Sequence, residues 1–185
     1  MKKILTIRQA TEADLRSILL FEFRNRAWFA RFIPYQVLRR QTEHYFKQLL
    51  RGQLNTTVQY LVCLPNDVLI GRFTVQMLDR KKRSVEISYR VAKHFSNRGV
   101  AQYTLKHVLL ILDTYGIKEV YAQVANHNKA SINVLMACGF EFHEIQMNAI
   151  NLASKVYDGL IFRWVPGEAM PCLPIFDKAR VYSAH

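Results

Sequence analysis

The feature that most constrains the fold is a strand-like run followed by a tight turn and an amphipathic helix. The run RSVEISYRVA alternates polar and apolar side chains with a period of two, which predicts a strand over Val85–Val91. KHFSNRGVA follows, and Gly99 and Ala101 leave its backbone accessible because both are small. Since the first turn of a helix carries N–H groups without partners, this segment predicts an anion site that would fit a pyrophosphate.

The expected helix has one apolar stripe, and Gly116 is placed to end it. The stripe has helical spacing and consists of Ala101, Leu105, Val108, Leu109, Leu112 and Tyr115. A second β-like run, KEVYAQVAN, comes next, and HNKASINVLMACGF then predicts a short helix that ends at Gly139 and Phe140. The second half of the chain therefore alternates helix and strand.

The N-terminal half predicts two helices and an antiparallel meander. Thr11 followed by Asp14 is typical of a helix start, and Pro34 is expected to end the aromatic segment after that helix. A second helix is expected over residues 41–53, and strands over 60–64, 68–77 and 85–91. We therefore predict an α/β (α+β) single domain over residues 1–165, with a mixed, mostly antiparallel central sheet and helices on both faces. Residues 166–185, interrupted by glycine and proline, are expected to form a C-terminal extension packed on this domain.

Composition narrows the partners and the cellular location. The chain has 185 residues and is 50% hydrophobic, enough for one sizeable core. Its 3 cysteines lack a C-x-x-C pair, so we expect no disulfide framework and no metal site. Without an apolar run of membrane-span or signal-peptide length, a cytoplasmic protein with no membrane partner is expected. The net charge of +12 attracts polyanions, but the basic residues are spread along the chain, so direct nucleic-acid binding is not expected.

Two short motifs resemble those of the GNAT superfamily of N-acetyltransferases. Gly99-Val100-Ala101 matches the last half of its Gln/Arg-x-x-Gly-x-Gly/Ala acyl-CoA motif, and Asn128-x-x-Ser131 followed by Gly139-Phe140 resembles its next motif. The strand Glu86-Ile87-Ser88-Tyr89-Arg90-Val91 is similar to the Glu-Ile-Gly-Tyr-Trp-Leu strand of the RimJ/RimL branch, which acetylates ribosomal-protein N-termini. The resemblance extends from residue 4 to residue 165, which is most of the chain.

The resemblance implies acetyl-CoA as the cofactor. It assigns cofactor binding to Val91, Ser96, Asn97, Arg98, Gly99, Val100, Ala101, Asn128 and Ser131. Ser96 departs from the pattern because many relatives carry Gln or Arg at that position. We therefore expect backbone donors, rather than this side chain, to contact the pyrophosphate.

The resemblance also suggests catalytic residues. Glu86 is the candidate general base, and its place on the polar face of the strand leaves a solvated surface residue as the alternative. Ser131 is the candidate for contacting the thiol, and it is equally suited to the first turn of a helix capped by Asn128. Leu135 replaces the tyrosine that much of the superfamily uses as the acid, so that mechanism is not carried over.

The acceptor site is expected to be bounded on one side by Glu22, Asn25 and Phe29, unless these residues have only helix-surface and core roles.

The expected function is acetyl-CoA-dependent N-acetyl transfer by direct attack in a ternary complex. The RimJ/RimL resemblance favours a protein N-terminal α-amine as the acceptor. The pKa of such an amine, about 8, also means that its deprotonation requires less help than that of lysine, with a pKa of about 10.4. A polyamine, an antibiotic or another small amine remains an alternative acceptor, and a catalytically weak acyl-CoA-binding module remains an alternative function. The sequence gives no indication of the oligomeric state.

Overall fold

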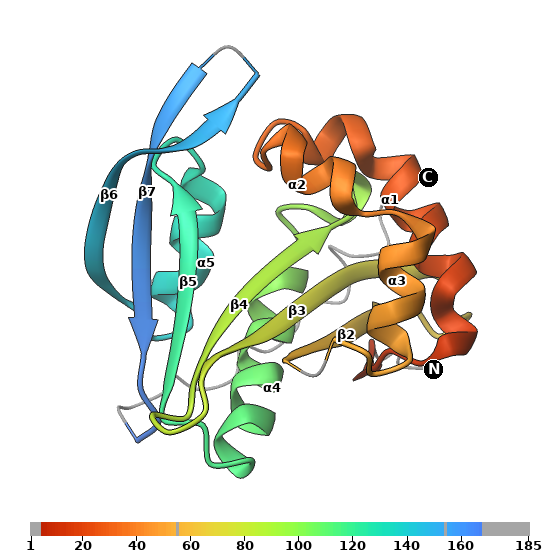
Figure 1. The fold of residues 1–185 in the computed structure, drawn as a ribbon, viewed down its shortest axis with the longest axis horizontal. Helices are drawn as coiled ribbons and strands as arrows, with labels where there is room; N and C mark the ends of the chain where they lie inside the picture. The colour runs from red at the N-terminus through yellow and green to blue at the C-terminus, as the bar shows by residue number, and fades with distance from the viewer. Residues whose placement is uncertain (1–4, 55, 154, 168–185) are drawn as a thin grey trace.

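The computed structural model describes residues 5–54, 56–153 and 155–167. They form one seven-stranded sheet in the order β1-β2-β3-β4-β5-β7-β6, with helices on both faces (Figure 1). Only β4 and β5 pair in parallel, so the predicted α/β class with a mixed, mostly antiparallel sheet is confirmed. The predicted C-terminal extension lies outside the described residues, apart from its first two positions.

The N-terminal half is an antiparallel meander with three helices inserted after its first strand. The inserted helices are α1 (Leu15–Phe29), α2 (Tyr35–Arg40) and α3 (Glu43–Leu50), preceded by a 3₁₀ turn at Glu12–Asp14. The strands are β1 (Thr6–Gln9), β2 (Thr57–Cys63), β3 (Leu69–Asp79) and β4 (Ser84–Val91). Adjacent strands pair in sequence order, as the predicted meander requires.

Local chemistry explains where the first helices begin. The Thr11 N–H donates to Asp14 Oδ2 over 2.8 Å, and Arg8 Nη2 pairs with Asp14 Oδ1 over 2.6 Å, which fixes the predicted helix start. Pro34 does not simply end a segment, as predicted, but is the N-cap of the unpredicted α2. A proline is tolerated there because the first N–H groups of a helix have no partner within it.

In the C-terminal half, a helical crossover leads to a second antiparallel unit. A 3₁₀ turn at Lys93–Phe95 leads to α4 (Val100–Thr114), which connects β4 to β5 (Glu119–Ala125). α5 (Lys129–Ala137) precedes the long hairpin of β6 (Glu141–Leu152) and β7 (Lys155–Trp164). β7 lies between β5 and β6 in the sheet.

The main core is formed between the sheet and the helices α4 and α5. Of the predicted stripe, Leu105, Val108, Leu109 and Leu112 are buried, whereas Tyr115 lies just beyond the helix and is exposed. A smaller apolar cluster beneath α1 and α3 consists of Ile18, Phe46, Leu61 and Cys63. No helix among the described residues has both the length and the apolar character needed to cross a membrane.

The two halves of the sheet meet along a short seam and then diverge. β4 and β5 are paired only at Ser84↔Glu119, Val85↔Val120 and Glu86↔Tyr121. Figure 1 shows the two strands separating beyond this seam, while β4 stays paired with β3 and β5 with β7. We call this wedge the β4–β5 opening. Among the described residues, the last five residues of β4 have no strand partner on the side of this opening.

Candidate active site

The predicted anion site lies at the turn that begins α4. Gly99 is the N-cap of α4 at φ +77°, and Asn97 also has a positive φ, +57°. Left-handed residues within such a turn direct successive N–H groups toward one point, where they form a concave anion site. A Cβ atom on Gly99 would have no heavy atom within 4 Å, so the space beside the turn is open. Geometry and space both fit a diphosphate held by N–H groups.

Several side chains around this turn are engaged within the protein, which leaves the backbone N–H groups of the turn to bind an anion. The Ser96 hydroxyl donates to the carbonyl oxygen of Ala92 over 3.3 Å, so it is engaged within the turn itself. Val100 is buried and anchors the first turn of α4 in the core, while Val91 ends β4 just before the turn. Arg98 and Ala101 are half-buried beside them. The predicted cofactor residues of the first motif therefore lie together at one end of β4.

The second motif lies at the N-terminus of α5. The Asn128 side chain caps the helix by accepting from the Ser131 N–H over 3.3 Å. The Ser131 hydroxyl is itself 2.8 Å from the hydroxyl of Tyr89 on β4. This contact joins β4 to α5, so Ser131 combines its helix-start position with a polar contact toward β4. Leu135 is buried in the core.

Tyr89 is a candidate functional residue that sequence reasoning missed. Its position on the apolar face of the strand indicated only a core role. In the structure its ring stacks on Phe73, with centroids 5.1 Å apart, while its hydroxyl reaches Ser131. Burial raises the pKa of Tyr89, so the hydroxyl keeps its proton at neutral pH and is available as a donor. The local pattern could not reveal a contact made 42 residues away.

Glu86 lies where the two strands begin to separate. It occupies the face of β4 opposite to the buried Val85 and Ile87, and it is half-buried beside the exposed Ser88. Among the described residues its carboxylate has no hydrogen-bond or ion-pair partner. Burial raises the pKa of Glu86, which makes the carboxylate a stronger base than an ordinary surface glutamate.

The residues predicted to bound the acceptor site connect α1 to the end of β4. Glu22 pairs with Arg72 over 2.6 Å and also with Arg90. Asn25 Oδ1 accepts from the Lys93 N–H over 3.1 Å. Phe29 is buried, and the Arg90 guanidinium lies over its ring, 5.6 Å from the centroid. Glu22 is therefore part of a buried ion cluster beside β4 and does not face solvent.

An aromatic stack connects the two sides of the opening at its wide end. The His127 ring lies between Phe32, which follows α1, and Tyr157 on β7, with centroid distances of 6.0 and 4.1 Å. His127 Nε2 is also 3.3 Å from the carbonyl oxygen of Arg31. Within the part of the chain that the structure describes, no three His, Cys, Asp or Glu residues group to hold a metal ion.

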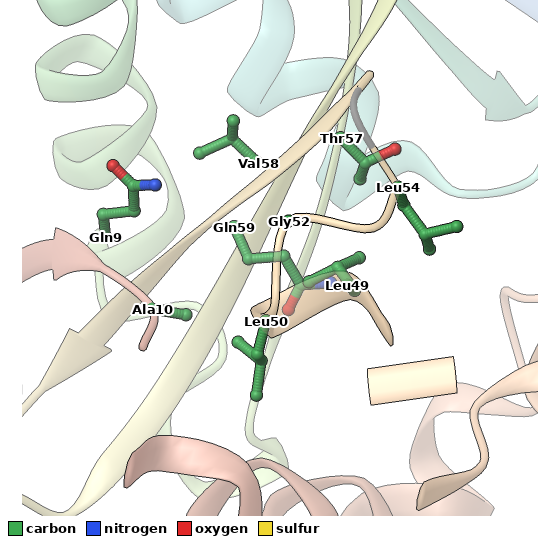
Figure 2. Close-up of a pocket in the computed structure, with 9 residues that line it drawn as sticks. All are labelled: Gln9, Ala10, Leu49, Leu50, Gly52, Leu54, Thr57, Val58 and Gln59. Carbon is green, nitrogen blue, oxygen red and sulfur yellow. The ribbon is translucent and has the colours of Figure 1, made fainter. Parts of the chain in front are cut away.

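A separate pocket of about 280 Å³ lies between α3 and the strands β1 and β2 (Figure 2). It is lined by Gln9, Ala10, Leu49, Leu50, Gly52, Leu54, Thr57, Val58 and Gln59. Thr57 pairs with Gln76, which pairs with Glu86, so the pocket is two strands away from β4. No titratable side chain is part of this lining.

Comparisons with known proteins agree with this geometry. The acetyltransferase (GNAT) domain family matches residues 5–141, which include both motifs. No match is found among curated proteins. The ribosomal-protein-S5-alanine acetyltransferase of Vibrio fischeri superposes with a TM-score of 0.79 at 16% identity, over 92% of this chain and 100% of its own.

Two further solved structures share the fold, and both contain a CoA species. Mycobacterium smegmatis RimJ, in complex with CoA-disulfide, has a TM-score of 0.75 at 17% identity, over 88% of this chain and 82% of its own. The spermidine N-acetyltransferase of Vibrio cholerae, in complex with CoA and spermine, has a TM-score of 0.74 at 20% identity, over 87% and 95%. At such low identities, the superpositions establish only that the fold is shared. The family match establishes that the chain is a member of the family. The predicted relationship is confirmed, and this chain belongs to the acetyltransferase (GNAT) domain family.

Proposed function

We propose that this acetyltransferase transfers the acetyl group of acetyl-CoA to the α-amine of a protein N-terminus, by direct attack in a ternary complex. The observation that carries the proposal is the placement of three features at the β4–β5 opening. These are the positive-φ turn at Gly99, the carboxylate of Glu86, which has no partner in the described part of the chain, and the Tyr89–Ser131 hydroxyl pair. The complexes of RimJ and spermidine N-acetyltransferase with CoA species support the choice of cofactor.

In this proposal, each feature has one task. Backbone N–H groups from Asn97 to Ala101 hold the pyrophosphate, and Gly99 permits the required left-handed backbone. Acetyl-CoA supplies the acetyl group as an activated thioester. Val91, which ends β4, and Asn128, the N-cap of α5, contact the cofactor between the turn and Ser131 in this proposal.

The residues of β4 and α5 then move protons. Glu86 takes a proton from the incoming ammonium group, and the nitrogen lone pair attacks the thioester carbon. The carbon–sulfur bond breaks, sulfur receives a proton from the Ser131 hydroxyl, and the Tyr89 hydroxyl restores it. The nitrogen releases its second proton to water as the amide forms. Glu86 then gives its proton to water, and Tyr89 takes one proton from water, so both residues return to their starting states. Overall, one proton is released to solvent.

The choice of acceptor rests on the branch resemblance and on charge. The ribosomal-protein acetyltransferases among the solved neighbours support an N-terminal α-amine. An α-amine is partly neutral at pH 7, because its pKa is about 8. The spermidine enzyme supports the small-amine alternative. However, a chain with 26 basic and 14 acidic residues, and with arginines beside the opening, repels a polycation.

A competition assay tests the acceptor. Thiol release from acetyl-CoA is measured with N-terminal peptides of ribosomal proteins, with the same peptides blocked at the α-amine but containing lysine, and with spermidine. The proposal expects the free N-termini to be acetylated fastest. Preferential acetylation of lysine or spermidine would replace it with the small-amine function, and no thiol release would favour the binding module.

Calorimetry tests the cofactor site separately. Gly99→Glu adds bulk and negative charge at the turn and is expected to abolish acetyl-CoA binding. Gly52→Glu is the matched control, because Gly52 also has a positive φ (+70°) and no atom within 4 Å of an added Cβ. Equal affinity in the two folded variants would remove the anion site from the proposal.

A further inference from the structure

The polar face of β4 forms a line of three side chains beside the opening. Glu86, Ser88 and Arg90 occupy alternate positions and therefore share one face of the strand. Ser88 is exposed and small, so the space between the other two is not filled by its side chain. At about 3.3 Å per residue, the Cα atoms of Glu86 and Arg90 are separated by about 13 Å. A ligand lying along this face would have to span this distance to reach from Glu86 to Arg90.

The Arg90 end of this line has an excess of positive charge. Arg72 and Arg90, opposite each other on β3 and β4, share the single carboxylate of Glu22. The exposed fractions of the three side chains are 2% for Arg72, 11% for Arg90 and 9% for Glu22. Within the described residues no second carboxylate pairs with either guanidinium, so the cluster carries a net charge of +1. Buried charges are normally paired, because the protein interior solvates them poorly.

The two arginines differ in how many of their donors are used. Arg72 donates to Glu22 over 3.0 and 2.6 Å, to Gln41 over 2.7 Å and to Thr74 over 3.3 Å. Arg90 donates to Glu22 through Nη1. A guanidinium has five N–H donors, so among the described groups Arg90 retains the greater capacity for another acceptor.

The electrostatic environment agrees with this unequal pairing. Burial, and then the neighbouring positive charge of Arg72, lower the pKa of Arg90 to about 10, although Glu22 opposes the shift. The charged form of Arg90 is thus less stable here than in water. A carboxylate placed beside it would stabilise that form and balance the cluster.

We propose that Arg90 selects acceptors whose N-terminal segment carries an acidic side chain, which it binds while the α-amine lies at Glu86. The inference deepens the proposed function and rests on it. An extended peptide advances about 3.3 Å per residue, so the separation of about 13 Å is four steps and places the acidic residue at the fifth position, give or take one. The substrate class is therefore an acidic N-terminal segment of a protein.

The test uses hexapeptides that differ only at the fifth position. Ala-Ala-Ala-Ala-Glu-Ala is compared with its Gln and Lys counterparts, and kcat/KM is measured by thiol release from acetyl-CoA. Binding of the same peptides, fluorescently labelled at their C-termini, is measured by anisotropy in the presence of CoA. For the wild-type protein we expect the Glu peptide to exceed the Gln peptide about tenfold or more in kcat/KM, mainly through KM, and the Lys peptide to be poorest.

Arg90→Met is the decisive variant, because it leaves Glu22 and Arg72 as a balanced pair and is therefore expected to fold. It should reduce the Glu-to-Gln ratio to about one. Arg51→Met removes one positive charge from an exposed pair with Glu12 and should retain the wild-type ratio. Arg90→Lys keeps the charge but loses the fork-shaped donor group, and should retain only part of the preference.

The two readouts distinguish this inference from the proposed function. Acetylation with no preference for the Glu peptide, or a preference that survives in Arg90→Met, would overturn the inference and leave the function standing. Arg90-dependent binding of the Glu peptide without acetylation would support the acidic-segment site and overturn the function. Neither binding nor acetylation of any peptide would overturn both.

Discussion

Glu22 and Glu86 lie on the same side of the sheet, yet their surroundings are opposite. Glu22 on α1 is held between two guanidiniums, whereas Glu86 on β4 has no charged or hydrogen-bonding partner among the described residues. Opposite charges stabilise an ionised carboxylate, while burial alone destabilises it. Partners, rather than depth of burial, therefore distinguish a carboxylate that holds elements together from one suited to accept a proton.

The largest expected effect comes from breaking the paired site. Glu22→Gln leaves two buried guanidiniums without a carboxylate, and we expect the free energy of unfolding to fall by about 3–5 kcal/mol. Urea denaturation measures this change. Glu12→Gln, which removes the carboxylate of an exposed pair with Arg51, should change it by less than about 1 kcal/mol. Equal stabilities of the two variants would show that burial does not strengthen the Glu22 cluster.

Replacing the unpaired carboxylate should affect turnover more than stability. Glu86→Gln is expected to lower kcat about 10- to 1000-fold at neutral pH, with a smaller loss as the pH approaches the pKa of the amine. Because burial raises the pKa of Glu86, the acidic limb of the wild-type pH profile should lie above the ordinary range for glutamate. The exposed Glu144 of β6 provides the control variant Glu144→Gln. Unchanged kcat in Glu86→Gln would identify Glu86 as a spectator.

The same substitution gives a stability prediction of opposite sign to that of Glu22. A carboxyl whose pKa is raised by folding contributes stability below its unfolded pKa, and that contribution is lost as the pH rises through its folded pKa. At pH 7 the ionised Glu86 therefore disfavours the folded state, and Glu86→Gln should raise Tm. The increase should disappear in acid. Thermal melts at several pH values measure it, and a lower Tm at pH 7 would point to an attractive partner on Glu86.

Tyr89 extends the comparison to a buried acid that does have a partner. Tyr89→Phe removes the hydroxyl that contacts Ser131 and is expected to lower kcat by about tenfold or less, because a thiol of pKa about 8.5 already leaves readily. Tyr60→Phe, at a buried position of β2, is a control for loss of a tyrosine hydroxyl. Single-turnover kinetics separate this step from binding. A loss that exceeded that of Glu86→Gln would make proton donation to sulfur the more demanding step.

The smallest expected effect belongs to Asp14, a buried carboxylate paired with the exposed Arg8. The hydrogen bond from Arg8 lowers the pKa of Asp14 to about 2, even though burial opposes the shift. Its stabilisation is present above the ordinary aspartate pKa and is lost as the pH falls toward 2. Asp14→Asn should cost about 1 kcal/mol at pH 7, since Arg8 is 39% exposed and solvent screens the pair. Calorimetric melts should show no difference in strong acid, and activity should not change.

The sequence predicted those parts of the fold that depend on near neighbours. The alternation around Glu86 placed β4 within a residue of its observed bounds, and the apolar stripe with Gly116 placed α4. Thr11 and Asp14 marked the helix start, because the capping box is formed within four residues. The six-residue α2 was missed, since a helix of that length depends on tertiary packing more than on its own pattern.

The acceptor side could not be predicted in the same way. Glu22 meets Arg72 and Arg90 across 50 and 68 residues of sequence, and no local pattern encodes those contacts. The Tyr89–Ser131 contact likewise depends on how α5 lies against β4. The turn at Gly99 could be predicted because a positive φ favours glycine, so this single residue indicates the local backbone conformation.

The short seam between β4 and β5 also has a consequence for the molecule's slow motions. Three register pairs join two half-sheets. The other strand pairs of the described residues all lie within one half or the other, so each half resembles a separate cooperative unit. Amide hydrogen exchange should show that the strands of one half are protected more strongly than those of the other. Within β4, the least protected amides should be those of residues 87–91 that face the opening. A molecule bound across the wedge would couple the two units and slow exchange in both.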